Sequence, residues 1–457
     1  MESFVDYYWA GRKGHLIGIG GVSMSPLAEV LAEAGLVITG SDLNDSANVQ
    51  HLRSKGIQVF VGPQKAENIP DDAEFVVRTA AARDNNPEVI EAHRRGLPVF
   101  ERTQAWGAIM KDYRNSLCIS GTHGKTTTTS MCTHILMAAE RDPTVMIGGT
   151  LPLLHAAHRV GAGDTIVMEA CEYYNSFLSF SPTVAVILNI EPDHLDFFKD
   201  IEDIKASFRK FASLVPPHGY IVANAEDKNT MDALKPLDRD IFTFGMNKGA
   251  DVYAANIQRL GTQTEFDVMY GEEVYTHVNL RVPGDHNIKN ALAASAAAIC
   301  LGCSPSAIRY GLAGFAGANR RFEFKGKYNG ADIYDDYAHH PRELQVLLDA
   351  VEPLGYRRVI VVFQPHTYSR TKALFNEFVE QLKRPDFCYL AEIYAAREKN
   401  TLGISSADLA KELPNGLFFA DNSELEKTLR AVASPGDIIL TVGAGDVYRI
   451  GEKLLEN

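Results

Sequence analysis

The chain has 457 residues, of which 46% are hydrophobic and 23% charged, and its formal net charge at pH 7 is −13. This length exceeds what a single hydrophobic core supports, so we expect two to four domains of an ordinary globular protein. The acidic balance, without long basic runs, argues against nucleic acid as a partner. No apolar run is long enough to cross a bilayer, and the first residues lack a signal-peptide pattern, so we expect a cytoplasmic protein without a membrane partner.

A glycine turn near the start of the chain predicts a Rossmann-like β-α-β unit. From residue 14 to residue 42 the pattern is strand, glycine turn, helix and second strand, with the helix expected to stop at Gly35. The turn contains Gly18, Gly20 and Gly21, and Asp42 lies where a ribose-binding acid could sit. Ser23 stands where the dinucleotide fingerprint has its third glycine. A dinucleotide and a sugar nucleotide need the same cradle, so this pattern leaves both ligands open.

The rest of this first segment continues the same alternation. Strands are predicted at 57–60, 75–78 and 98–100, and a short helix around Trp106 follows them. We therefore expect residues 1–112 to form a Rossmann-like first domain.

The next segment predicts a phosphate-binding loop. An apolar strand at 116–119 is followed by a glycine loop and a threonine-rich helix. The loop and the first helical turn consist of Gly121, Thr122, His123, Gly124, Lys125, Thr126 and Thr127. Glycines let backbone N–H groups approach phosphate oxygens, while Lys125 would reach the outer phosphates and the Thr126 hydroxyl would reach Mg²⁺. The motif is a shortened form, because Ile119 stands where a further glycine is usual; the alternative is a plain glycine-rich turn.

Acidic residues and a histidine follow the next two predicted strands. Glu169 and Glu172 come directly after the strand at 165–168, and His194 comes shortly after the strand at 184–190. α/β proteins keep their sites at the carboxyl ends of strands, and carboxylates with one imidazole suit Mg²⁺ or Mn²⁺ near phosphates. The alternatives are charges at a helix N-terminus and a capping or core histidine.

A β-rich stretch from 252 to 282 precedes an Ala-rich helix whose start carries His286, Asn287 and Asn290. Polar residues at that place can recognise the edge of a base, or can simply cap the helix.

We expect the second domain to span 113–319. It ends before a third segment, 320–457, in which strands at 332–336, 358–363, 387–390 and 437–442 each precede a polar loop. This alternation predicts another doubly wound α/β domain.

Six cysteines are present, and most lie in apolar runs that are typical of buried thiols. Cys300 and Cys303 have the spacing of a redox or zinc half-site. No second pair accompanies them, and they close the Ala-rich helix, so we expect a structural role.

Eight motifs in order along the chain resemble those of the Mur ligase family, the ATP-dependent amide-forming enzymes of peptidoglycan precursor synthesis. They are GIGGVS at 18–23, GTHGKTT at 121–127, NIEPDH at 189–194, GDHN at 284–287, NRRFE at 319–323, DDYAHHP at 335–341, FQPH at 363–366 and TVGAGD at 441–446. The likeness is greatest to the branch that adds L-alanine to UDP-N-acetylmuramate. Other branches carry a carbamylated lysine where Phe208 stands here, and the alanine-adding branch also lacks it.

The resemblance implies a fold and a reaction. It implies three α/β domains: a Rossmann-like domain for the UDP moiety, a P-loop-type ATPase domain, and a C-terminal domain that receives the amino acid. ATP would phosphorylate the lactyl carboxylate of UDP-N-acetylmuramate, and the amine of L-alanine would displace phosphate from this acyl phosphate. Catalysis is then mostly positioning and charge neutralisation.

The resemblance also implies roles for single residues. Lys125 would hold the β,γ-phosphates, and Thr126, Glu169 and His194 would bind Mg²⁺. The remaining ATP-binding residues would be those of the glycine loop with His286, Asn287, Asn290, Arg320, Arg321, Asp335 and Asp336. The amino acid would contact Tyr337, His339, His366 and Arg370, with Arg370 as the carboxylate fork. Gly18, Gly20, Gly21, Ser23, Ser41 and Asp42 would line the UDP site.

Other interpretations and several questions stay open. The chain could attach a recycled peptide in place of alanine, or polyglutamylate a folate, and the first glycine turn alone would also fit an NAD-dependent dehydrogenase or a nucleotide-binding protein without ligase activity. The sequence leaves undecided the general base for the amine (His339 is one candidate), the role of Glu172, the number of metal ions, the oligomeric state, the affinities, the order of binding, and the tolerance for glycine or serine.

Overall fold

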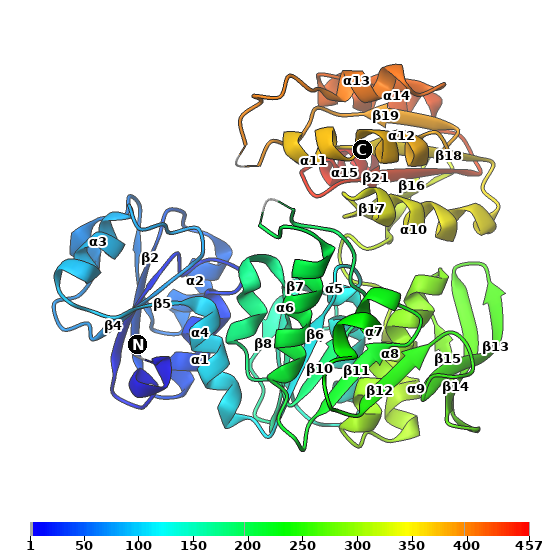
Figure 1. Ribbon diagram of the computed structural model, residues 1–457. Helices are drawn as coiled ribbons and strands as arrows, with labels where there is room; N and C mark the ends of the chain where they lie inside the picture. Colours follow the sequence, from blue (N-terminus) through cyan, green and yellow to red (C-terminus); the bar gives the residue numbers. More distant parts are fainter. Residues whose placement is uncertain (1–2, 196, 397, 457) are drawn as a thin grey trace. The chain divides into compact units, whose positions relative to one another are not determined.

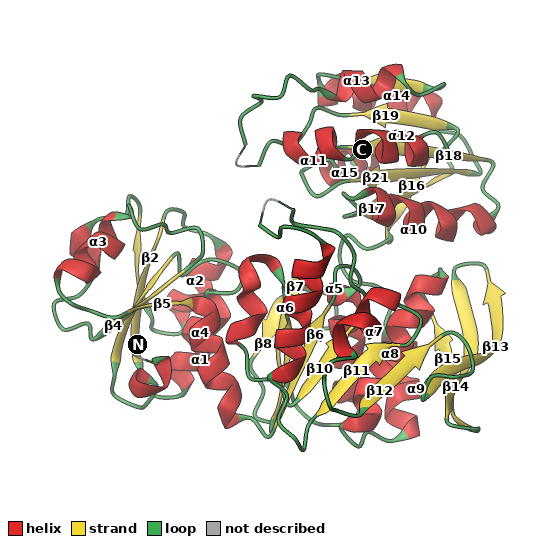
Figure 2. Cartoon of the chain, viewed as in Figure 1, coloured by secondary structure: helices red, strands yellow, loops and turns green. Residues whose placement is uncertain are grey.

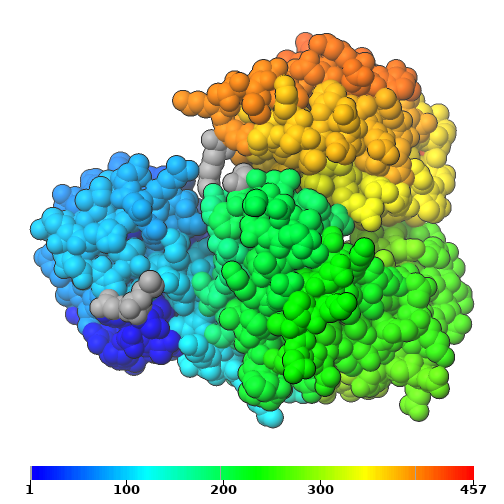
Figure 3. Space-filling model, in the orientation of Figure 1, coloured from blue at the N-terminus to red at the C-terminus, as the bar shows by residue number. Residues whose placement is uncertain are grey.

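The structure, a computed structural model, describes residues 3–195, 197–396 and 398–456 (Figure 1; Figure 3). Its strands form three sheets, all flanked by helices, as the predicted α/β class requires. By compactness the chain divides into two units. The first comprises 1–255, 267–278 and 289–314, and the second comprises 256–266, 279–288 and 315–457.

The first sheet is wholly parallel and has the strand order β3-β2-β1-β4-β5. Its strands are β1 (Lys13–Ile17), β2 (Val37–Asp42), β3 (Gln58–Val61), β4 (Phe75–Arg78) and β5 (Val99–Glu101), and its helices are α1 (Ser25–Glu33), α2 (Ala47–Ser54), α3 (Pro87–Arg94) and α4 (Arg102–Ile109). The order reverses between β1 and β4, and ligands of such sheets bind at the carboxyl ends beside the reversal. The glycine turn that follows β1 lies at this point.

The second sheet has ten strands in the order β15-β14-β13-β12-β11-β10-β6-β9-β7-β8. They are β6 (Asn115–Ser120), β7 (Thr144–Leu151), β8 (Ala156–Arg159), β9 (Thr165–Glu169), β10 (Val184–Ile187), β11 (Tyr220–Asn224), β12 (Ile241–Gly245), β13 (Val252–Leu260), β14 (Gln263–Tyr270) and β15 (Glu273–Leu280). The helices are α5 (Lys125–Ala138), α6 (Ile201–Ser213), α7 (Lys228–Leu234), α8 (Asp285–Cys300) and α9 (Pro305–Gly314). Strand β6 runs parallel to both β9 and β10, so whatever follows these three strands meets at one edge of the sheet.

The core around this sheet is close-packed. Phe208 is fully buried on α6, and its ring meets that of Phe177 edge-on at 5.2 Å between centroids. Helices α5 and α9 approach closely at Gly311, where a Cβ would lie 2.5 Å from the Ile135 Cα. This packing fixes the direction of α5, the helix that begins at the glycine loop.

The third sheet has the order β16-β17-β21-β18-β19-β20 and is parallel apart from the β16–β17 pair. Its strands are β16 (Glu323–Tyr328), β17 (Ala331–Asp336), β18 (Arg358–Phe363), β19 (Phe387–Leu390), β20 (Gly416–Phe418) and β21 (Asp437–Val442). Its helices are α10 (Pro341–Val351), α11 (Tyr368–Ala373), α12 (Phe375–Leu382), α13 (Ser406–Lys411), α14 (Asn422–Val432) and α15 (Tyr448–Leu455).

Alternating side chains of this third sheet supply two separate cores. On β18, Val361 and Phe363 pack with α10, α12 and α13, whereas Ile360 and Val362 pack with α14 and α15. Helices therefore cover both faces (Figure 2), as expected for a buried parallel sheet. The loops at the carboxyl ends of β17 and β18 carry the polar residues predicted for the amino acid.

Candidate active site

The glycine loop between β6 and α5 has the backbone of an anion-binding turn. Gly121 and Gly124 have φ values of +141° and +86°, in the region that favours glycine. A Cβ on Gly121 would lie 2.9 Å from the Leu188 Cβ, and one on Gly124 would lie 2.6 Å from Asn290 Oδ1. Conformation and space therefore both demand glycine, and α5 begins at the next residue with its N–H groups directed at the loop.

Neighbouring loops hold the glycine loop from the side of β10. Asn189 accepts the His123 backbone N–H at 2.8 Å and donates its amide to the His123 carbonyl at 3.0 Å. The Thr122 hydroxyl accepts the Glu191 N–H at 2.9 Å. Sequence analysis found Asn189 only as part of a motif and placed it inside a strand at 184–190, whereas β10 ends at Ile187 and leaves Asn189 in the loop.

Lys125 is an ion-pair partner of Glu172. Its Nζ lies 3.0 Å from Glu172 Oε2 and also donates to the carbonyls of Thr122, at 3.1 Å, and Gly121. Burial disfavours the charged amine, but the Glu172 carboxylate outweighs it and raises the pKa of Lys125. The side chain is thus a fixed cation beside the loop.

Glu172, whose role the sequence left open, is buried and joins Lys125 to His194. The His194 Nε2 lies 3.8 Å from Glu172 Oε1 and 3.8 Å from Asp193 Oδ2. The Tyr173 ring stacks on His194 with centroids 4.2 Å apart. His194 and Tyr174 both have positive φ, an uncommon backbone state that concentrates at functional sites.

Glu169 forms a separate pair with Thr126, which lies in the first turn of α5. Its Oε1 accepts the Thr126 hydroxyl at 3.1 Å, and its Oε2 accepts the Gly148 N–H at 2.7 Å. A Cβ on Gly148 would lie 2.6 Å from Glu169 Oε1. The predicted metal residues Thr126 and Glu169 are therefore in contact, while His194 pairs with Glu172.

The predicted adenine-side residues lie at the start of α8. Asn287 is buried and donates to the Pro283 carbonyl at 2.7 Å, and Asn290 lies against Gly124. The His286 ring packs on Gly284, and burial lowers its pKa to about 4. Asn290 is thus placed at the phosphate loop, whereas the Asn287 side chain bonds to the turn that precedes the helix.

The predicted UDP residues cluster around the turn after β1. Asp42 accepts the Gly20 N–H at 2.9 Å, and the backbone carbonyl of Ser41 accepts the Gly18 N–H at 2.8 Å. The Ser41 hydroxyl is buried and donates to Glu88 at 2.6 Å, while Ser23 accepts a hydrogen bond from Arg102. A Cβ on Gly21 would lie 3.2 Å from the Gly18 carbonyl oxygen, so the turn is tight. Several of these side chains therefore hold the turn, and their contact with a ligand stays a prediction.

Two basic residues predicted to bind ATP lie near the aspartates that end β17, and one of them, Arg320, forms an ion pair there. Arg320 lies 2.8 Å from Asp335 and donates to the carbonyls of Gly443 and Gly445. Burial raises the pKa of Asp335, although the Arg320 charge acts in the opposite direction. Asp336 accepts the Phe322 and Ala338 N–H groups, both at 2.8 Å, and burial raises its pKa to about 6 although Arg321 is near.

The four residues predicted for the amino acid lie together within the second unit. The His339 and His366 ring centroids are 5.7 Å apart, and Tyr337 meets His339 edge-on at 5.4 Å. Arg370 lies one helical turn after His366, and its guanidinium contacts the His366 ring at 3.2 Å. Glu343, which the sequence did not single out, lies in the first turn of α10 and contacts His339.

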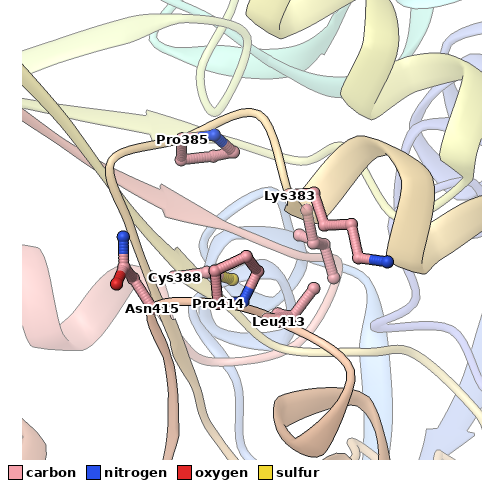
Figure 4. A pocket seen from close by; sticks show the side chains of 7 residues that line it. Lys383, Pro385, Cys388, Leu413, Pro414 and Asn415 are labelled. Atoms are coloured by element: carbon pink, nitrogen blue, oxygen red, sulfur yellow. The ribbon is translucent and has the colours of Figure 1, made fainter.

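Features outside this site are few. Cys300 and Cys303 are free thiols, and a small pocket lined by Leu382, Cys388 and Leu413 contains none of the predicted site residues (Figure 4). Across the described ranges, no helix is both long and apolar enough to traverse a membrane. Among these same residues, no group of three or more His, Cys, Asp or Glu side chains is arranged to hold a metal ion.

Comparisons with known proteins agree with these motifs. Three family models match in order: the Mur ligase family catalytic domain at 13–114, the Mur ligase middle domain at 119–298 and the Mur ligase glutamate ligase domain at 320–445. The UDP-N-acetylmuramate–L-alanine ligase of Clostridium novyi (strain NT) is 45% identical over 97% of both chains, and that of Lachnospira eligens is 47% identical over 97% of both.

A solved structure extends the likeness to the fold. The UDP-N-acetylmuramate–alanine ligase of Thermotoga maritima superimposes with a TM-score of 0.79 at 28% identity, covering 97% of this chain and 98% of that one. Family models, relatives and fold thus agree over nearly the whole sequence. The chain belongs to the Mur ligase family.

Proposed function

We propose that this protein is an ATP-dependent ligase that joins L-alanine to the lactyl carboxylate of UDP-N-acetylmuramate in peptidoglycan precursor synthesis. The observation that carries the proposal is the similarity, over 97% of the chain, to relatives with that name. The reaction passes through an acyl phosphate, because an unactivated carboxylate oxygen is too poor a leaving group for an amine to displace. We place it in the cytoplasm, because the resemblance to the Mur ligases implies cytoplasmic precursor synthesis.

ATP is the proposed phosphoryl donor, with its outer phosphates on the loop between β6 and α5. The two positive-φ glycines and the start of α5 support this placement, because the first backbone N–H groups of a helix favour an anion at its N-terminus. Lys125 is a fixed cation beside that point and would neutralise charge on the transferring group. The amide of Asn290 lies against the same loop and would help to hold the nucleotide.

Mg²⁺ is the proposed metal, with Mn²⁺ as a substitute. The Thr126 hydroxyl and the Glu169 carboxylate are hard oxygen donors already in contact beside the phosphate loop. Mg²⁺ is commonly held by one or two carboxylates with water and substrate phosphates, so this donor set fits it. His194 with Glu172 is the proposed position for a second ion. A bound ion would neutralise phosphate charge, and Lys125 and the loop amides would do the same from the protein.

The other two ligands have separate proposed positions. We place the UDP moiety on the turn after β1, with residues 1–112 as its domain and 113–319 as the ATP domain. The tight glycine turn at the carboxyl end of β1 and its position beside the strand-order reversal support this. We place L-alanine at Tyr337, His339, His366 and Arg370 in a domain of residues 320–457, where a guanidinium suits the carboxylate.

Phosphate release from ATP tests the proposal. The full chain is given Mg²⁺, UDP-N-acetylmuramate and one acceptor at a time: each amino acid, and the recycled tripeptide. We expect release that depends on both the UDP-sugar and L-alanine. Release only with the tripeptide would assign a peptide-recycling ligase, and tight ATP binding without release for any acceptor would overturn the ligase function.

A further inference from the structure

The two histidines that face each other in the second unit have opposite hydrogen-bond environments. His339 lies between β17 and α10, and His366 lies between β18 and α11. Their centroids are 5.7 Å apart at an interplanar angle of 64°. Because the two nitrogens of a neutral imidazole differ, one donating and one accepting, the partner of each ring fixes what the ring offers to a ligand.

His339 is held with its proton on Nδ1. This nitrogen lies 3.0 Å from the Tyr337 carbonyl oxygen. A carbonyl oxygen only accepts, so Nδ1 donates and the lone pair of the neutral ring is on Nε2. Burial lowers the pKa of His339, with Arg370 and Arg321 acting in the same direction and Glu343 opposing them. The ring is therefore neutral near pH 7 and offers an acceptor at Nε2.

His366 is held in the opposite tautomer. Its Nδ1 lies 3.2 Å from a guanidinium nitrogen of Arg370, and a guanidinium only donates. Nδ1 is therefore the acceptor, and the proton of the neutral ring is on Nε2. Burial lowers the pKa of His366 to about 4, so the ring stays neutral at physiological pH. The Tyr394 ring stacks on it at 5.7 Å between centroids and fixes its plane.

Glu343 contacts His339 on the Nδ1 side of its ring. It is the third residue of α10 and accepts the backbone N–H groups of His339 at 2.9 Å and His340 at 3.2 Å. The same carboxylate oxygen lies 3.3 Å from His339 Nδ1. Because two backbone bonds fix its position, the charge of Glu343 lies steadily on the Nδ1 side of the ring and favours a proton there.

We propose that this pair of opposite tautomers divides recognition of the amino acid between its two ends, with Glu343 as the positioning residue for His339. The Nε2 of His339 accepts a proton from the attacking amine, and the Nε2–H of His366, together with Arg370, donates to the carboxylate. The inference rests on the proposed ligase function, which it deepens.

The proton balance of the step is complete. As the bond between the amine nitrogen and the acyl carbon forms, the bond between that carbon and the phosphate oxygen breaks. Inorganic phosphate leaves with that electron pair, and the amine proton passes to His339 Nε2. The charged and titratable groups that face His339 are Glu343, Arg321, Arg370, His366 and Tyr337.

The tautomers can be observed directly in the full chain labelled with ¹⁵N in its imidazoles. Long-range proton–nitrogen spectra distinguish a protonated from an unprotonated ring nitrogen, and the variants His339→Gln and His366→Gln assign the signals. We expect His339 protonated at Nδ1, His366 protonated at Nε2, and both sets of signals to move on addition of L-alanine. The same tautomer in both rings would overturn the inference.

Kinetics of Glu343→Gln test the positioning role. Gln keeps an acceptor for the helix cap but removes the charge behind Nδ1. We expect kcat to fall about tenfold, with KM for alanine changed much less, since a weaker base slows only the step that moves the proton. The acid limb of the pH profile should move to lower pH, because Glu343 raises the pKa of His339. A matched control is Asp408→Asn, the corresponding capping-box acid of α13. If Glu343→Gln lowers only the melting temperature, as the control does, Glu343 is merely a cap.

Two variants of His366 test recognition of the alanine carboxylate. His366→Leu removes the Nε2–H donor and should raise KM for alanine about tenfold or more, the cost of a hydrogen bond to a charged group. His366→Gln carries an amide N–H at nearly the same place and should restore KM to within a few-fold. Equal effects of Leu and Gln would overturn the donor role.

Failure of this inference and failure of the proposed function differ in outcome. Alanine-dependent phosphate release from a protein whose two imidazoles share one tautomer would reject the inference alone. If alanine supports no release and moves neither imidazole signal, both the ligase function and the roles assigned to the two histidines are rejected.

Discussion

The Glu172 carboxylate lies 3.0 Å from the Lys125 ammonium, and beside the glycine loop the Glu172 side chain is buried while that of Lys125 is 14% exposed. Removing one partner of a buried ion pair leaves an uncompensated charge, which is costly. A phosphate placed on the loop would compete with Glu172 for the same cation. The pair therefore links folding stability to the occupancy of the phosphate site.

Glu172→Gln should lower the free energy of unfolding by about 3–5 kcal/mol, because Lys125 then stays buried without its counter-ion. ATP should restore that counter-ion, so the rise in melting temperature that ATP produces should be larger in the variant than in the wild type. Thermal unfolding with and without ATP measures both effects. Glu272→Gln breaks the exposed pair with Lys248 and should change stability by less than about 1 kcal/mol. An equal ATP effect in Glu172→Gln and wild type would contradict this picture.

Lys125→Ala should abolish turnover, since it removes the cation that would neutralise the transferring phosphoryl group, while UDP-sugar binding changes by no more than a few-fold. Phosphate release and calorimetric titration of the UDP-sugar separate the two properties. Lys248→Ala, at an exposed pair with Glu272, is the control and should retain activity. Retained turnover in Lys125→Ala would remove the phosphate-loop assignment.

Gly124→Ala should disrupt the loop for two reasons, a φ of +86° and a Cβ 2.6 Å from Asn290 Oδ1. Gly355→Ala has a φ of +72° but open space around its Cβ, so it isolates the backbone cost of about 1–2 kcal/mol. We expect Gly124→Ala to weaken ATP binding much more than Gly355→Ala, as measured by titration. The double variant Gly124→Ala, Asn290→Ala relieves the clash, so the two substitutions should not add. Strict additivity would mean that the Asn290 contact is unimportant.

Acidification should destabilise the fold through His286. Burial lowers its pKa from 6.5 to about 4, so the neutral ring contributes stability that is complete above pH 6.5. That contribution is lost as the pH falls from 6.5 to about 4, because the unfolded chain takes up the proton first, and it amounts to about 3 kcal/mol. Urea unfolding between pH 7 and pH 4 should show a flatter pH dependence for His286→Gln than for the wild type. The exposed His277 offers the control His277→Gln, which should leave the wild-type slope. Equal slopes for all three proteins would show that His286 titrates normally.

The family of this chain follows from its sequence, because the motifs are local. A glycine loop between an apolar strand and a helix start is recognised by the order of residue types alone, and eight such segments in order specify the three α/β sheets. The same reasoning located Lys125, Glu169 and His194, since polar residues after buried strands collect at one edge of a parallel sheet.

Only the tertiary structure decided which of these residues meet. Strand order and helix packing bring Glu172 to Lys125 and place Asn290 against Gly124, although these partners are far apart in the sequence. The side chains of Ser41 and Asp42 form hydrogen bonds to Glu88 and Gly20 within the first domain. The tautomer of His339 depends on a carbonyl that contacts its Nδ1, and that of His366 depends on a guanidinium that contacts its Nδ1. Periodicity and motifs record the local conformation of the chain, whereas these pairings depend on distances of about 3 Å between separate elements, which the completed packing sets.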